Sequence, residues 1–76
     1  MKYLFRFFVQ PNSKNDSSYL LKMYNFNEDK VPFFLLKDDE ITIDDNFYKV
    51  TKCSYSFETL CDGTYMIDYD IEEVEY

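Results

Sequence analysis

The chain opens with a segment in which large apolar side chains recur at every second position. Within KYLFRFFVQ one alternating set is entirely apolar and the other is mixed: Tyr3, Phe5, Phe7 and Val9 against Lys2, Leu4, Arg6, Phe8 and Gln10. A period of two is typical of a β-strand, whose successive side chains point to opposite faces. The pattern therefore predicts a first strand with one buried face and one half-covered face.

The middle of the chain contains two further apolar stretches. After Pro11 and a polar run that favours turns, the stretch YLLKMYNF predicts a strand over residues 19–26. A short helix over the same residues is the alternative, because the apolar positions match neither period well. The block from Phe33 to Leu36 is too short for an independent helix and predicts a short buried strand or a 3₁₀ turn.

The stretch EITIDDNFYKV predicts a tight β-hairpin. Two β-rich runs flank Asp44, Asp45 and Asn46, which are residue types that tolerate left-handed turn conformations. The second run extends over residues 47–58, and its apolar phase changes near Thr51 and Lys52. A strand accommodates such a change by a bulge or a bend, so we expect one there.

The C-terminal segment alternates more strictly than any other. A turn is expected over residues 60–63, where Gly63 accepts a positive φ without a Cβ penalty. The following residues divide into an apolar set and a largely acidic set: Tyr65, Ile67, Tyr69 and Ile71 against Thr64, Met66, Asp68, Asp70 and Glu72. This pattern predicts a final strand with one core face and one row of carboxylates in solvent.

Together these segments predict an all-β domain spanning residues 1–76. The expected architecture is a strongly bent antiparallel sheet of five or six strands, resembling a small SH3-like or OB-like barrel. A helix at residues 19–26 would make the fold α+β instead. The chain has eight Phe and eight Tyr, which bury about 150–250 Å² each and suit a core built from only 76 residues.

The charge of the chain indicates the kind of partner it has. Fifteen acidic residues against eight basic ones give a net charge of −7, which disfavours direct binding to nucleic acid or to an anionic membrane. A basic protein is the expected partner. No run reaches the roughly 18–20 apolar residues of a membrane helix, and Arg6 interrupts the N-terminal run that a signal peptide would need. We therefore expect a cytoplasmic protein with reduced thiols at Cys53 and Cys61.

The residue types argue against catalysis and against a bound metal or cofactor. The chain has no His and a single Arg, so the usual general base of hydrolases is absent. The spacing Asp68-x-Asp70-x-Glu72 resembles the start of a calcium loop, but the Gly at the sixth position and the Glu at the twelfth are missing. We expect no enzymatic activity, no cofactor and no metal site.

The carboxylates are the candidate binding residues. Alternate residues of a strand stand roughly 6.6–6.8 Å apart, a spacing similar to that of successive phosphates, so the final strand could imitate a nucleic-acid backbone. The candidate partner-binding residues are Asp68, Asp70, Glu72, Glu73 and Glu75, supported by Asp38, Asp39, Asp44 and Asp45. Alternatively, the acids protect an edge strand from aggregation, or that edge pairs with another chain. Exposed Tyr24, Tyr48 and Tyr76 would add aromatic anchors.

The run VPFFLLKDDEITIDDNFYKVTKCSYSFE, followed by MIDYDIEEV, resembles small proteins of phages and mobile elements. These share an extended VP segment, an E-I-x-I-D-x-x-x-Y-K-V hairpin and a closing acidic strand. The resemblance covers Val31 to Val74. Small acidic phage proteins include anti-defence inhibitors of the anti-CRISPR kind, several of which mimic nucleic acid. The resemblance implies this strategy and assigns no functional residue.

Three functional hypotheses follow. The first is a non-enzymatic, phage-type or mobile-element protein that inhibits a nucleic-acid-binding defence protein of the host through its carboxylates. The second is a small-ligand binder, such as a sponge for a nucleotide signal, which would need a basic pocket built from Arg6, Lys22, Lys49 and Lys52. The third is a structural subunit of a homo-oligomer or virion, held by exposed edge strands.

Overall fold

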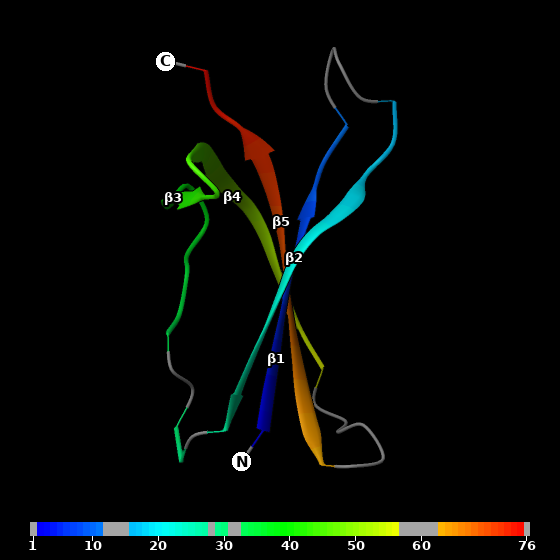
Figure 1. The fold of residues 1–76 in the computed structure, drawn as a ribbon, viewed down its shortest axis with the longest axis vertical. Helices are drawn as coiled ribbons and strands as arrows, with labels where there is room; N and C mark the ends of the chain where they lie inside the picture. Colours follow the sequence, from blue (N-terminus) through cyan, green and yellow to red (C-terminus); the bar gives the residue numbers. More distant parts are fainter. Residues whose placement is uncertain (1, 12–15, 28, 31–32, 57–62, 76) are drawn as a thin grey trace.

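The computed structural model describes residues 2–11, 16–27, 29–30, 33–56 and 63–75. These residues form five strands and no helix: β1 (Lys2–Val9), β2 (Tyr19–Asn27), β3 (Glu40–Ile43), β4 (Asn46–Tyr55) and β5 (Thr64–Glu73). The strands make one sheet in the order β2-β1-β5-β4-β3, strongly curled into a half-barrel (Figure 1). The all-β prediction is confirmed, and the helical alternative for residues 19–26 is wrong.

The sheet is mixed, which differs from the wholly antiparallel arrangement expected. β1 and β5 pair in parallel and run toward the same end of the molecule (Figure 1), whereas the three other pairs are antiparallel. A parallel pair needs a long crossover connection, and here the whole of β2, β3 and β4 lies between the two strands in sequence. Local patterns carry no information about such a pairing.

The final strand is in the middle of the sheet. β5 is hydrogen-bonded to β1 on one side and to β4 on the other, so the expectation that it forms an edge is wrong. Its acids therefore do not protect an edge, and it offers no free edge to another chain. The two edge strands are β2 and β3.

The core lies on the concave side of the curled sheet. It contains the predicted inward set of β1 together with residues of β5, β4 and β3: Tyr3, Phe5, Phe7, Val9, Ile43, Tyr48, Val50, Ile67, Tyr69 and Ile71. Aromatic rings pack closely there, with centroids 5.3 Å apart for Phe7 and Tyr69. The alternation seen in β1 and β5 thus decided which face became the core.

Residues 33–36 cover part of this core without forming regular secondary structure. Phe33 and Leu35 point into the core, whereas Phe34 and Leu36 are exposed. The ring of Phe33 stacks on Phe5 at a centroid distance of 4.3 Å, and the Leu35 N–H donates a hydrogen bond of 3.1 Å to the hydroxyl of Tyr69. The segment is extended, so it is neither the short strand nor the 3₁₀ turn that we expected.

The predicted hairpin and bulge are both present. Asp44 and Asp45 have φ values of 50° and 67°, and Ile43 pairs with Asn46, as a two-residue turn of type I′ requires. The register of β4 against β5 shifts between Val50 and Lys52, where the apolar phase changes in the sequence.

That shift keeps apolar side chains on the concave face. Before it Val50 pairs with Ile71, and after it Cys53 pairs with Tyr69, so both sets face the core. β4 ends at Tyr55, and residues 57–62 of the predicted strand and turn lie outside the described residues. Gly63 has the expected positive φ, of 84°.

Candidate protein-interaction surface

The first predicted binding residue, Asp68, is engaged within the protein. Both of its carboxylate oxygens accept hydrogen bonds from Arg6 on the adjacent strand β1, from Nε at 2.7 Å and from Nη2 at 2.6 Å. The guanidinium also lies over the ring of Phe8, 5.2 Å from its centroid. The hydrogen bonds from Arg6 to Asp68 raise the pKa of the guanidinium, against the opposing effect of burial. The negative charge of Asp68 on the convex face is therefore largely neutralised by Arg6.

The two following acids of β5 also stand beside cations. Asp70 lies opposite Lys52 and Glu72 lies opposite Lys49 in the register of β4. Directly opposite residues of an antiparallel pair project to the same face. The carboxylates of β5 thus alternate with bases of the flanking strands and do not form an uninterrupted anionic row. The negative field along this strand is therefore reduced.

The structure brings other predicted acids together at one end of the sheet. The N–H of Val74 donates a hydrogen bond of 2.9 Å to the carbonyl oxygen of Phe47, and Tyr48 pairs with Glu73. The end of β5 therefore lies beside the β3–β4 hairpin, at the upper end of Figure 1. We call the acids gathered here the acidic end: Asp44, Asp45, Glu72, Glu73 and Glu75.

Aromatic side chains accompany the acidic end. Phe47 and Tyr19 are 49% and 42% exposed, whereas Tyr48 is 4% exposed. Burial is the main cause that raises the pKa of Tyr48, and the charges of Tyr19, Glu73 and Asp44 raise it further. Sequence reasoning assigned anchor roles to Tyr24, which is half-buried, to Tyr48, which is buried, and to Tyr76, which lies outside the described residues. It missed Phe47 and Tyr19, because strand periodicity does not show which side chains the curl of the sheet covers.

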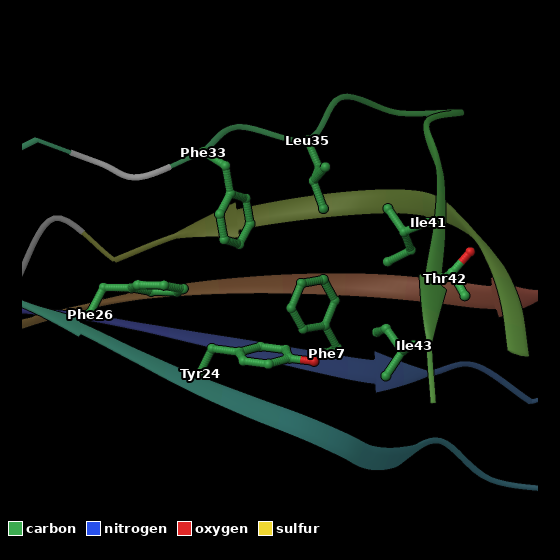
Figure 2. A pocket seen from close by; sticks show the side chains of 8 residues that line it. All are labelled: Phe7, Tyr24, Phe26, Phe33, Leu35, Ile41, Thr42 and Ile43. Atoms are coloured by element: carbon green, nitrogen blue, oxygen red, sulfur yellow. The ribbon is translucent and has the colours of Figure 1, made fainter. Parts of the chain in front are cut away.

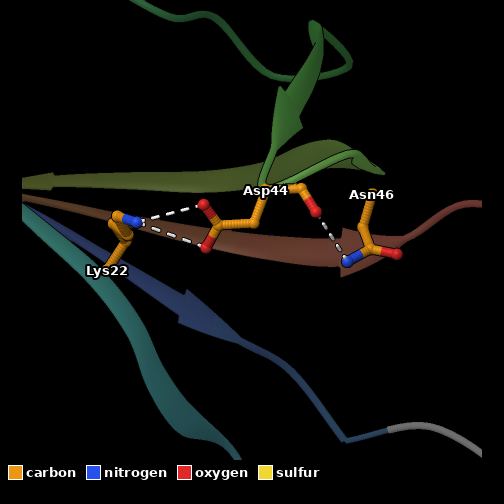
Figure 3. Close-up of polar contacts among 3 residues, drawn as sticks. All are labelled: Lys22, Asp44 and Asn46. Carbon is orange, nitrogen blue, oxygen red and sulfur yellow. Dashed lines mark hydrogen bonds and ion pairs between the residues drawn. The ribbon is translucent and has the colours of Figure 1, made fainter.

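Asp44 links the hairpin to the opposite edge of the sheet. Its two carboxylate oxygens accept hydrogen bonds from Nζ of Lys22 on β2, at 3.1 and 3.2 Å (Figure 3). Its carbonyl oxygen accepts a bond of 3.3 Å from the side-chain amide of Asn46. Both charged groups are exposed to solvent, so the ion pair contributes little to stability.

The acids before β3 have local structural roles. Asp39 accepts a hydrogen bond of 2.7 Å from the N–H of Leu36, and Asp38 forms an ion pair of 3.5 Å with Lys49. The N–H of Asp38 also donates to the carbonyl oxygen of Val50 at 2.8 Å, and its φ is 77°. These two acids therefore shape the entry into β3, some distance along the sheet from the hairpin turn.

An apolar groove of about 280 Å³ lies on the concave side between the two edges of the sheet (Figure 2). Its lining comes from β1, β2, β3 and the 33–36 segment: Phe7, Tyr24, Phe26, Phe33, Leu35, Ile41, Thr42 and Ile43. None of the four cations considered for a nucleotide pocket lines this groove. A second hollow at the other end of the sheet includes Lys2 but likewise none of those four.

Among the described parts of the chain, no three His, Cys, Asp or Glu side chains converge in a way that would hold a metal ion. In those same parts, nothing forms a helix of the length and apolarity needed to cross a membrane. Cys53 is half-buried and carries a free thiol. Comparison with protein-family models, with curated proteins and with solved structures found no match to this chain.

Proposed function

We propose that this chain is a non-enzymatic interaction protein that binds a basic protein through its acidic end. The observation that supports the proposal is the convergence of the hairpin turn and the end of β5, which gathers several carboxylates around exposed aromatic residues. Exposed charge steers a basic partner to the surface, and an aromatic side chain beside it supplies apolar contact area. The net charge of −7 favours the same class of partner.

We further propose that the partner is a nucleic-acid-binding protein of a host cell. This chain, a protein of phage or mobile-element type, would inhibit it in the host cytoplasm. A surface of Lys and Arg that binds phosphates is the complement that several neighbouring carboxylates need. In this form the acidic end occupies the phosphate site, and Asp68 and Asp70 do not, because Arg6 and Lys52 lie opposite those two carboxylates.

The test compares two variants of equal net charge. Glu72→Gln/Glu73→Gln removes two carboxylates of the acidic end, whereas Asp16→Asn/Asp29→Asn removes two exposed carboxylates elsewhere. The immobilised wild type should capture basic proteins from a bacterial lysate and release them as salt rises from about 0.1 to 1 M, since the Debye length falls from about 10 to about 3 Å. A short DNA duplex should displace the same proteins.

We expect the Glu72/Glu73 variant to lose most of this capture and the Asp16/Asp29 variant to retain it. Equal capture by both variants, or capture that neither salt nor DNA reduces, would contradict the proposal. Circular dichroism of both variants checks that the sheet is intact.

A further inference from the structure

The curled sheet is open along one side. β2 pairs with β1 alone and β3 pairs with β4 alone, so each of these edge strands keeps one row of backbone groups without a strand partner among the described residues. The apolar groove lies between these two edges, with Tyr24 and Phe26 of β2 on one side and Ile41 of β3 on the other (Figure 2). An exposed edge beside an apolar groove is the arrangement that β-strand addition uses.

Within the described residues, few contacts close the opening between these edges. The ion pair between Lys22 and Asp44 spans it at the hairpin, and both side chains are largely exposed, at 38% and 62%. Phe33 and Leu35 pack on the core and line the groove, but they do not fill it. β2 is nine residues long, which is enough to pair with a whole extended segment.

The charge of the molecule indicates what would occupy the groove. A second copy would bring another net charge of −7 beside the first. Asp44 and Asp45 directly follow Thr42 and Ile43 of the groove lining, so they lie at the end of the groove. A small polar ligand would find few anchoring groups, since the lining is apolar apart from Thr42 and the hydroxyl of Tyr24. An extended segment with alternating apolar and basic side chains satisfies both the groove and the acids at its end.

We propose that an extended segment of the basic partner adds to the free edge of β2 as a sixth strand. Its apolar side chains enter the groove, and its Lys or Arg side chains point outward and reach Asp44 and Asp45. This inference rests on the proposed function and names the binding mode of the same partner.

The experiment uses a peptide as the probe and amide hydrogen exchange, followed by NMR, as the readout. The probe is a capped nine-residue peptide of alternating Lys and Val, matched in length to β2. Its controls are the same peptide with the central residue replaced by Pro, which removes a ladder donor, and a peptide of alternating Glu and Val. We expect about tenfold slower exchange for alternate amides of β2, those directed away from β1, with the Lys–Val peptide and not with the controls.

A variant pair tests the groove itself. Thr42→Lys places a cation at the exposed rim of the groove, and Ser54→Lys places the same charge on the exposed convex face of β4. Thr42→Lys should abolish the protection of the β2 amides, and Ser54→Lys should retain it. Thr42→Gln, which changes size without charge, should behave as the wild type does.

Several results would overturn strand addition. These are unchanged exchange at β2 in the presence of the peptide, equal effects of the Pro-containing control, or protection that appears without peptide as protein concentration rises, which would indicate a second copy. If the Glu72/Glu73 variant still loses basic-protein capture while the β2 amides exchange freely, only the binding mode is wrong. If neither capture nor protection occurs, the proposed function fails as well.

Discussion

At the scale of single residues, Arg6 and Asp68 show how a predicted surface charge became part of the fold. Their side chains are 29% and 27% exposed, and they form two short, charge-assisted hydrogen bonds across the β1–β5 pair. A carboxylate held in this way contributes to the stability of the sheet. Replacing Asp68 by a positively charged residue would place that charge directly beside Arg6. Its neighbours Asp70 and Glu72 lack such a bidentate partner among the described residues.

We therefore predict that Arg6→Met and Asp68→Leu each lower the free energy of unfolding by about 1 kcal/mol or more, because each leaves a partly buried charge unpaired. The double variant Arg6→Met/Asp68→Leu should cost less than the sum of the two, since it removes both charges together. Urea denaturation of the four proteins measures this coupling. Strictly additive losses would mean that the ion pair contributes nothing.

At the scale of elements, the β3–β4 hairpin combines a favourable turn sequence with local strain. Asp44 and Asp45 both have positive φ, a region that costs L-residues about 1–2 kcal/mol in general and Asp somewhat less. Glycine at the second position is the preferred choice for this turn type. The hairpin therefore retains a carboxylate at Asp45 at some cost in stability, as expected if the acidic end has a function.

We predict that Asp45→Gly raises the melting temperature and that Asp45→Val lowers it. A gain of about 1 kcal/mol corresponds to about 4–8 °C for a domain of this size. Calorimetry at high salt separates the backbone effect from the loss of one surface charge. A melting temperature that falls in the glycine variant would show that the turn is unstrained at this residue.

At the scale of the whole molecule, the core contains phenols that remain neutral in the folded state. Burial is the main cause that raises the pKa of Tyr69 and of Tyr48 above the ordinary value of 10.0. In the unfolded chain these phenols lose their protons near pH 10, whereas the folded chain retains them to a higher pH. The folded state then binds more protons than the unfolded state, so the free energy of unfolding must fall as pH rises above about 10.

Tyr69→Phe tests this linkage. The variant leaves the N–H of Leu35 without its acceptor, which should cost about 1 kcal/mol at pH 7. It should nevertheless lose less stability than the wild type between pH 9 and pH 11, because one of the phenols whose pKa is raised in the folded state no longer exists. Urea midpoints measured across this range give both quantities, and parallel declines in the two proteins would contradict the assignment to Tyr69.

The sequence allowed much of the fold to be predicted and less of the candidate site. The inward set of β1, the turn at Asp44 and Asp45 and the bulge near Lys52 were all predicted correctly, because each depends on residues close together in the chain. Five of the nine predicted acids are exposed and four are half-buried, and the sequence did not show which of them would lie together. The groove between β2 and β3 was missed, since it exists only where the curl of the sheet leaves two edges unpaired.

The sequence by itself determined where strands form and which of their faces are apolar, because alternation and turn chemistry act over a few residues. Only the tertiary structure decided that β5 pairs in parallel with β1 in the middle of the sheet. That pairing joins Arg6 to Asp68 across 62 residues of sequence. The antiparallel pairing of β5 with β4 brings the end of β5 to the hairpin, which assembles the acidic end. Contacts over such separations depend on the packing of the whole core, and no local pattern encodes them.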